Sequence, residues 1–320
     1  MTFAMNLRLL YRLLCVFVCS TATVFSFFSA PDTRSWAQVT DDFVAREAQH
    51  ANEGSRDGCR LKKLDPKRAL TFLMPFLAKD RPLGLRVKAI GALGWSSLQD
   101  AVPALSVIAK DATESEQVRA MALNPGLRYM KSPEAVKTAS SLAADQSKSI
   151  RGSAYWVLSD HGTDSAIEVL ESRLRSNDRP LLKQLMYALA FSKHPRAGKI
   201  VFDLVDFPAI QHDEELLTAY SITMAQYSIA EAQQNMLDVA QQPGRPLSSY
   251  YALCYFGSFP SEAVASVLIA YIEADRPAND LYESVTRFIN SPKLTEESRR
   301  KLSVFIASGK VKKAEQTIPK

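Results

Sequence analysis

Apolar residues recur at helical spacing through most of the 320-residue chain, in segments that are separated by short polar turns. This spacing predicts amphipathic α-helices rather than strands. The clearest example covers residues 85–111, which read as a helix, a polar turn and a second helix. Weaker copies of this unit recur about every 32 residues, nearly to the end of the chain.

Each unit is predicted to hold a first helix, the A helix, and a second one, the B helix. Regularly placed Pro, Ser or Thr residues mark the starts of the A helices, where Pro loses no hydrogen bond and Ser or Thr caps the helix. Successive marks lie 30 to 33 residues apart: Pro103, Pro133, Thr163, Pro195, Ser228, Pro260 and Pro292. A fixed period of this size predicts stacked helical units, and hence an all-α solenoid, a right-handed α-α superhelix.

The B helices carry a sharper signature, in which an apolar residue and Arg are followed by Ala and then by a small-residue motif. Three Arg residues share this register, and an Asp precedes each of them: Asp80 and Arg86, Asp111 and Arg119, Asp145 and Arg151. The planar guanidinium suits carboxylate pairs, so we predict a structural ladder in which each Arg bonds the Asp of its own or the adjacent turn. The alternative is a basic stripe on the B-helix face, ready for an acidic ligand.

This pattern resembles the HEAT-repeat family, in particular the HEAT-like repeats of the phycobilisome-lyase type. Their units read as apolar-Arg-x-x-Ala-x-x-Ala-Leu-Gly, a turn, and then apolar-Pro-x-Leu. The match is close over residues 80–160, looser over 161–290 and absent before residue 60. It implies an ARM/HEAT-type solenoid and leaves the function open.

Two features qualify this resemblance. Tetratricopeptide repeats have a similar period, but their aromatic and Gly-Tyr pattern is not found here. The run Asn124-Pro125-Gly126 falls where the B helix of one unit should still continue. Because Pro removes a hydrogen bond and clashes with the preceding turn, we expect that helix to end or kink there.

Residues 1–37 are predicted to be a signal peptide. Arg8 and Arg12 precede a 16-residue apolar run at residues 13–28, and Ser35 and Ala37 supply the small residues of a cleavage site. The mature chain would then begin at Gln38 and be periplasmic or secreted. The alternative is an uncleaved membrane anchor formed by residues 13–28, although this run is short for a span.

The rest of the chain divides into three parts. Residues 38–64 are expected to form a lead-in, with a helix at 41–52 capped by Thr40 and a polar Gly-containing linker at 53–60. About seven HEAT-like repeats follow at residues 65–290. Residues 291–320 are predicted to form a capping helix at 295–307 and a basic tail with Lys310, Lys312 and Lys313.

The amino-acid composition restricts the possible classes of protein but does not indicate a function. Apolar residues make up 47% of the chain, ample for a large core, and the net charge of +5 is too small to argue for nucleic-acid binding. After residue 37 only Cys59 and Cys254 remain. Because they lie about six repeats apart, we predict two unlinked thiols.

The sequence offers little chemistry. It contains no zinc-protease, Cys-x-x-Cys or nucleophile-elbow motif and no phosphate-binding Gly loop, so we predict no metal and no cofactor. The four His residues do not pair at ligand spacing. The dense acidic run from His212 to Glu215 is predicted to be the first turn of a B helix, where carboxylates favour the positive end of the dipole.

A row of Tyr residues recurs with nearly the period of the units, and two further aromatic residues lie in the densest aromatic patch. The row is Tyr155, Tyr187, Tyr220, Tyr251 and Tyr282, and the patch adds Tyr255 and Phe256. On a concave face such rings would form a peptide-binding surface. The register drifts by one or two residues, and each step rotates a side chain by ~100°, so core positions are the alternative. Trp95 and Trp156 are predicted to fill the core between units.

These patterns together favour an exported, non-enzymatic scaffold that binds a protein or peptide along its B-helix face. The alternative is an enzyme or enzyme accessory of the bilin-lyase type, which the resemblance implies and the export signal argues against. Contact with a membrane is expected only through the signal segment, and the oligomeric state stays open.

Overall fold

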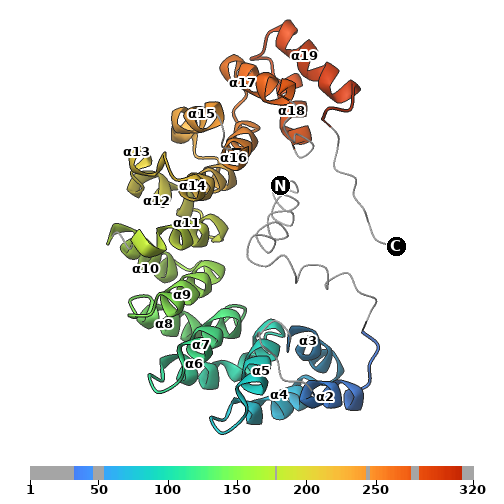
Figure 1. Cartoon of the computed structure of the whole chain (residues 1–320), viewed down its shortest axis with the longest axis vertical. Coiled ribbons are helices and arrows are strands. Elements are labelled where there is room, and N and C mark those ends of the chain that lie inside the picture. Colours follow the sequence, from blue (N-terminus) through green and yellow to red (C-terminus); the bar gives the residue numbers. More distant parts are fainter. Residues whose placement is uncertain (1–31, 46–53, 177–178, 243–245, 275–280, 312–320) are drawn as a thin grey trace.

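The computed structural model of the chain is an arc of stacked helix pairs (Figure 1). It describes residues 32–45, 54–176, 179–242, 246–274 and 281–311. Every regular element within these ranges is helical, and no strand is present in them. The prediction of an all-α solenoid is therefore confirmed.

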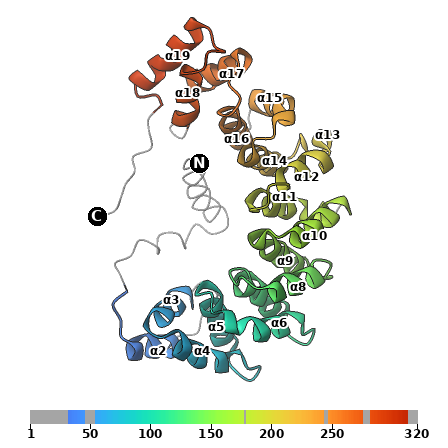
Figure 2. The same cartoon turned by 180° about the vertical axis from the view of Figure 1, so that it is seen from behind.

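The A helices form the outer row of the arc, as Figures 1 and 2 show from opposite sides. They are α2 (Trp36–Ala45), α4 (Pro66–Leu73), α6 (Val102–Lys110), α8 (Pro133–Leu142), α10 (Asp164–Arg175), α12 (Ala197–Leu204), α15 (Gln233–Gln241) and α17 (Glu262–Glu273). A 3-10 turn, Met74–Leu77, extends α4, and the short helix α13 (Phe207–Ile210) follows α12.

The B helices line the concave side. They are α3 (Ser55–Leu64), α5 (Leu83–Trp95), α7 (Glu116–Met121), α9 (Lys148–His161), α11 (Leu182–Phe191), α14 (Glu214–Tyr227), α16 (Pro246–Phe256) and α18 (Tyr282–Ile289). Neighbouring B helices from α3 to α16 contact one another more extensively than neighbouring A helices do. This tighter packing bends the stack toward the B side. None of the described helices is long and apolar enough to cross a bilayer.

Pro103, Pro133 and Thr163 act at A-helix starts as predicted, whereas Pro195, Pro260 and Pro292 lie outside the helices. The Thr163 hydroxyl accepts a hydrogen bond from the Ala166 N–H at 3.3 Å, and Pro133 is the first residue of α8. Ser228 differs, because it has a left-handed backbone with φ 50° and ends helix α14. The acidic run before it behaves as predicted: Asp213 caps α14 and Glu214 and Glu215 occupy its first turn.

The predicted interruption of one B helix is confirmed. Helix α7 ends at Met121 and continues as a wide turn, η5 (Ala122–Leu127), in which Asn124 has the non-helical angles φ −130° and ψ 105°. The preceding B helix contacts this turn closely. A Cβ atom on Gly94 would lie 2.5 Å from the Pro125 carbonyl oxygen, so only Gly fits there.

The prediction of a linker at residues 53–60 is wrong, because residues 55–64 form helix α3. Its residues Gly54 and Gly58 lie against α5: Cβ atoms there would come within 2.0 Å of the Lys88 carbonyl oxygen and 2.4 Å of the Ala92 carbonyl oxygen. The two glycines therefore allow direct backbone contact between α3 and α5. Helices α2 and α3 make an additional helix pair that precedes α4.

The first helix of this pair begins earlier than predicted. Helix α2 starts at Trp36, so Thr40 lies inside it and its hydroxyl donates to the Trp36 and Ala37 carbonyls at 3.0 Å each. The C-terminal part of the predicted helix at 41–52 falls on residues outside the described ranges. The capping helix at the other end is confirmed: α19 (Glu296–Ala307) is capped by Thr295, which accepts from the Ser298 N–H at 3.2 Å.

An ion-pair cluster centred on Arg34, which we call the N-terminal clasp, fixes this first pair. Arg34 nitrogens lie 2.7 Å from Asp32, 2.6 Å from Asp42 and 2.8 Å from Asp57. The guanidinium beside Asp32 holds the pKa of that carboxyl well below its usual range. Lys88 of α5 lies 3.4 Å from Asp57, so the clasp connects the segment before α2 to the first two B helices.

Candidate interaction surface

Two of the three predicted ladder arginines, Arg86 and Arg119, tie neighbouring repeats together. Arg86 donates at 2.6 and 3.0 Å to Glu114, and both side chains are almost fully buried, at 7% and 5% exposure. Its Nε also donates to the Leu77 carbonyl at the end of the preceding A segment, at 3.3 Å. Each such Arg therefore caps its own A helix and pairs with an acid that precedes the next B helix.

The second arginine repeats this arrangement. Arg119 lies 2.7 Å from Asp145 and donates to the Ala109 carbonyl of α6 at 3.0 Å. Burial opposes ionisation of Asp145, but hydrogen bonds from the Ser147 N–H and from Arg119 outweigh it and lower the pKa. Arg151 donates to the Asp145 carbonyl oxygen at 2.7 Å rather than to its carboxylate.

The prediction allowed the Asp of the same turn or of the adjacent one, and Arg119 pairs with the adjacent Asp145 as predicted. The Asp of the same turn is not the carboxylate partner of Arg86 or of Arg119. Asp80 is exposed, and the partner of Arg86 is Glu114 of the next turn. Asp111 pairs with Lys79 at 2.7 Å instead of with Arg119. The ladder arginines are held between repeats by carboxylates and helix-end carbonyls, and this geometry favours the structural ladder over a basic stripe.

Most of the predicted aromatic row lies in the core. The buried members are Tyr155, Tyr220, Tyr251, Tyr255 and Phe256, each 6% exposed or less. Two of their hydroxyls form hydrogen bonds within the protein: Tyr220 accepts from Asn235 at 2.9 Å and Tyr255 donates to the Ile229 carbonyl at 2.7 Å. Burial raises the pKa of Tyr220 to about 12. These side chains cannot form an open surface, so that prediction is wrong for them.

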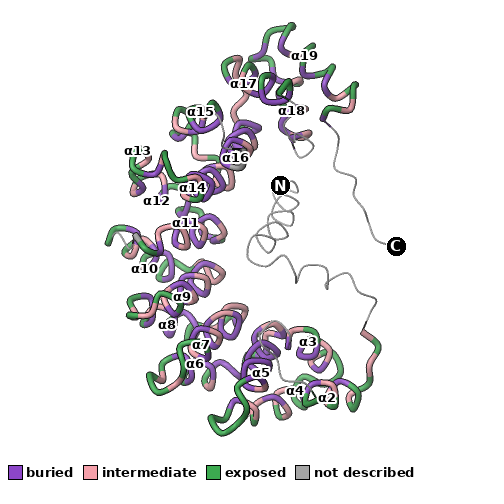
Figure 3. The backbone as a smooth tube through the Cα atoms, viewed as in Figure 1, coloured by how far each residue is buried: buried purple, intermediate pink, exposed green. Residues whose placement is uncertain are grey.

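Only Tyr187 and Tyr282 of the row stay half-buried. The position of Tyr187 follows from its helix. In α11 the core positions are Leu185 and Leu189, and at ~100° per residue Tyr187 and Phe191 lie on the opposite side, away from the A helices. Their rings lie 6.3 Å apart with planes at 10°. Helix α11 itself belongs to the inner row of the arc (Figure 3).

The aromatic rings that do line the B-helix side are mostly different ones. We define the aromatic strip as a set of half-buried residues on the B helices α5, α9, α11 and α16 and on the turn after η5. Its members are Trp95, Arg128, Tyr129, Trp156, Tyr187, Phe191 and Tyr250. Trp95 and Trp156 were predicted to fill the core, but both are partly exposed here.

Direct contacts make the strip continuous from α5 to α11. The Trp95 and Tyr129 ring centroids lie 4.6 Å apart. The Arg128 guanidinium lies 5.3 Å from the Tyr129 ring and 4.7 Å from the Trp156 ring, and it pairs with Asp160 of α9. The Trp156 ring is 6.2 Å from Phe191 with planes at 25°.

A small separate hydrophobic cluster supports the strip beyond α11. Ala190, Ile222 and Tyr251 are buried together there, and Tyr187, Phe191 and Tyr250 pack against them. This cluster joins α11, α14 and α16 on the side away from the main core. The strip thus spans several repeats, on B helices that form the inner row of the arc (Figure 1).

The strip residues can be found in the sequence if their positions are counted from the small-residue motif of each B helix. Trp95 and Phe191 each follow directly after an Ala-Leu-small motif, at Gly94 and Ala190, and Asp160 follows the corresponding Val-Leu-Ser motif. Counting from this motif finds the exposed column of the helix. The spacing of Tyr residues alone does not, because loop lengths vary between repeats.

A histidine with one feature of a catalytic pair proves to be structural. The Nε2 atom of His194 lies 2.8 Å from the Asp164 carboxylate, and its Nδ1 atom accepts from the Arg196 N–H at 3.2 Å. Both ring nitrogens are therefore occupied. Ser192 approaches only the backbone N–H of His194, at 3.2 Å, so the ring does not activate its hydroxyl. No cluster of metal-binding side chains occurs among the described residues.

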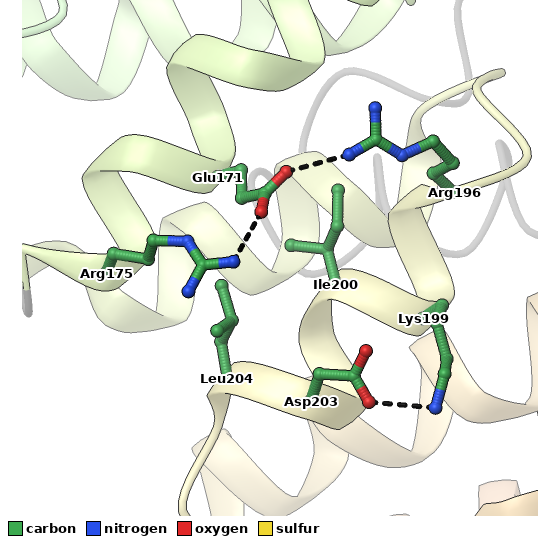
Figure 4. Close-up of a pocket in the computed structure, with 7 residues that line it drawn as sticks. All are labelled: Glu171, Arg175, Arg196, Lys199, Ile200, Asp203 and Leu204. Carbon is green, nitrogen blue, oxygen red and sulfur yellow. Dashed lines mark hydrogen bonds and ion pairs between the residues drawn. The ribbon is translucent and has the colours of Figure 1, made fainter.

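A small cavity lies on the convex side between α10 and α12 (Figure 4). Its volume is about 140 Å³, well below the ~300 Å³ of typical small-molecule sites. Its charged side chains already pair with one another: Glu171 lies 2.7 Å from Arg175 and 3.1 Å from Arg196, and Lys199 lies 2.8 Å from Asp203. We therefore place the candidate site on the concave strip.

Comparison with known protein families now identifies the repeats. The family model described as HEAT repeats matches residues 107–190. This part of the chain carries HEAT repeats. The matched residues run from within α6 to α11 and include Trp156, Tyr187 and most of the ladder. The match is to HEAT repeats in general and does not single out the phycobilisome-lyase type, and none of the curated proteins compared matches the chain.

The two cysteines lie on the same row of B helices. Cys59 is exposed in α3, where its thiol lies 3.8 Å from the Trp95 carbonyl oxygen, and Cys254 is half-buried in α16. Neither thiol forms a disulfide, as predicted. They flank the aromatic strip along the arc and provide attachment points for probes.

Proposed function

We propose that this protein is an exported, non-enzymatic scaffold that binds a protein or peptide partner along its concave B-helix face. The observation that carries the proposal is the aromatic strip. HEAT repeats commonly mediate protein interactions, and stacked repeats create extended concave surfaces. Aromatic rings and Arg are the side chains that most often dominate binding energy in interfaces, and here half-buried rings lie beside the half-buried Arg128.

A matched pair of variants tests the site. Tyr187→Asp places a charge within the strip, whereas Val107→Asp places one on the convex helix α6, where Val107 is 67% exposed. Immobilised proteins are used to capture ligands from the exported fraction of the native cell. We expect a partner that binds wild type and the Val107 variant equally but binds the Tyr187 variant at least ~10-fold less. Equal capture by all three proteins would remove the strip as the binding site.

Export is part of the same proposal, and the N-terminal clasp suggests where the signal peptide is cleaved. Residues 1–31, which hold the basic and apolar parts of the expected signal, lie outside the described residues. Cleavage after Ala37 would remove Arg34, which pairs with Asp42 and with the nearly buried Asp57. The clasp therefore favours a mature chain that still contains Asp32 and Arg34.

Intact-mass measurement of the exported protein tests this point. We expect a mass that includes residues 32–37, in place of the start at Gln38 that the sequence pattern alone predicts. A chain beginning at Gln38 would mean that the first helix pair is stable without the clasp. Recovery of the full-length chain from the membrane fraction would instead support an anchor at residues 13–28.

A further inference from the structure

The last residue of α9, His161, packs against the wide turn of the preceding repeat. Helix α9 contacts η5 directly, and the Leu127 and Met130 carbonyls lie close to the imidazole ring. The turn after α11 also lies against the end of α9, because a Cβ atom on Gly162 would lie 3.3 Å from the Lys193 backbone nitrogen. The ring is therefore held where three consecutive repeats meet.

This ring has a buried nitrogen without a hydrogen bond. The Nε2 atom of His161 is inaccessible to solvent, and no group in the described part of the chain donates to it or accepts from it. A neutral ring can leave this nitrogen unprotonated, whereas the protonated ring carries an N–H on both nitrogens. A buried charge without a hydrogen-bonding partner costs far more free energy than a buried neutral polar atom. The closed packing therefore favours the neutral ring.

The surroundings of the ring oppose its protonation. Burial lowers the pKa of His161 below its ordinary value of about 6.5, and the positive charge of Lys193 lowers it further. The two turn carbonyls and the Asp160 carboxylate act in the other direction, but they do not outweigh burial.

The other charged groups on the turns and helix ends around the ring are paired or exposed. Arg128 of the wide turn pairs with Asp160, and His194 of the turn after α11 lies 2.8 Å from Asp164 of α10. Lys131, which follows the wide turn, is exposed. None of these groups bonds the buried ring nitrogen.

We propose that His161 is a pH-sensitive switch, whose neutral ring holds the wide turn against the end of α9 and whose protonation in mild acid releases this turn. Two members of the aromatic strip, Arg128 and Tyr129, follow the turn directly. Release breaks the contacts of Arg128 with Asp160 and Trp156, which connect the turn to α9. Partner binding then becomes weaker in acid, and this consequence alone rests on the proposed scaffold function.

The closed packing is expected to lose stability as the pH falls. In the released state the ring is exposed to water and titrates at about pH 6.5. Because the closed state has the lower pKa, the released state binds the proton more readily. The closed packing therefore keeps its full stability above about pH 6.5 and loses stability as the pH falls below that value, toward the lower pKa of the closed state.

Hydrogen exchange of the full-length protein tests the switch. The reporters are the Arg128 and Met130 amides, which donate to carbonyls of the wide turn at 3.0 and 3.1 Å, and the control is the Ile229 amide, which bonds a carbonyl of α14 at 3.3 Å. Rates are corrected for the intrinsic pH dependence of exchange. We expect the protection of both reporters to fall several-fold between about pH 7.5 and about pH 5.5, where carboxylates, Lys and Arg ordinarily do not titrate, while that of Ile229 stays unchanged.

Substitutions of the ring separate this switch from other titrations. His161→Gln keeps a polar side chain that does not titrate, and His161→Leu supplies an apolar one if the first variant fails to fold. In either variant the reporter protection should no longer depend on pH over this range. His212→Gln is the matched control, because His212 is exposed in the turn before α14. This variant should respond to pH as the wild-type protein does.

Two results would overturn the switch. One is equal protection of the reporters at both pH values in the wild-type protein. The other is a fall that persists in the His161 variants, and its loss in His194→Gln would assign the response to the pair with Asp164 instead. Because these measurements need no partner, either result leaves the proposed scaffold function standing, and that function fails separately if Tyr187→Asp does not affect capture.

Discussion

Replacing Arg86 by Ala should lower the free energy of unfolding by ~3–5 kcal/mol, because it leaves Glu114 as an uncompensated buried charge. Both side chains are less than a tenth exposed, so solvent screens this pair little. The variant also frees the Leu77 carbonyl that Arg86 caps. Urea unfolding followed by circular dichroism measures the loss.

Two controls show whether the loss comes from the stranded charge. Changing Arg86→Met and Glu114→Leu together should recover most of the stability, since apolar replacements of a buried pair are often neutral. Lys199→Ala breaks a pair whose side chains are 47% and 49% exposed, and should leave the free energy of unfolding almost unchanged. A double variant as unstable as Arg86→Ala would mean that hydrogen bonding to the backbone, rather than the ion pair, supplies the stability.

Replacing Gly58 by Ala should detach the first helix pair from the rest of the arc. The added Cβ would lie 2.4 Å from the Ala92 carbonyl oxygen and 2.6 Å from its Cα atom, and neither backbone atom can move without displacing α5. We expect a loss of ~3 kcal/mol or more from the α3–α5 contact. Hydrogen exchange should then accelerate in residues 36–64 and stay unchanged beyond α7.

Gly152 in α9 is the matched control for this substitution. A Cβ atom at that position meets nothing within 4 Å. Ala favours a helix over Gly by ~0.8–1 kcal/mol, so Gly152→Ala should be neutral or slightly stabilising. If Gly58→Ala behaves like Gly152→Ala, the close approach of α3 and α5 is not what holds the first pair in place.

The architecture could be predicted from the sequence because each repeat carries its own evidence for it. Periodic apolar positions, helix-start residues and the Arg register each point to stacked helix pairs, so errors in one unit do not change the result. Helix α3 was missed for a physical reason. Its Gly and Lys residues read as a linker, whereas Gly54 and Gly58 are spaced to lie on one face and admit a neighbouring backbone.

The partners and the exposed rings were harder to predict. Arg86 and Arg119 were found by their register, but their acids lie in the following unit, and proximity in the chain favours the wrong residue. Tyr155 and Tyr220 have the right period but face the core. The direction of a ring depends on its position relative to the small-residue motif, and the wide turn at Asn124 shifts that position in one repeat.

The ladder gives the array a polarity that matters for cutting it into fragments. On the B-helix side the base belongs to one repeat and the acid to the next, as in Arg86 with Glu114 and Arg119 with Asp145. A fragment ending after α7 would keep Arg119 without Asp145, and a guanidinium cannot shed its charge in the physiological range. A fragment beginning at residue 112 would instead keep Glu114 without Arg86, and a carboxylate can take up a proton. Truncation from the C-terminal end should therefore destabilise the remaining repeats more than truncation from the N-terminal end. A stable fragment must extend far enough at its C-terminus to include the acid that precedes the next B helix.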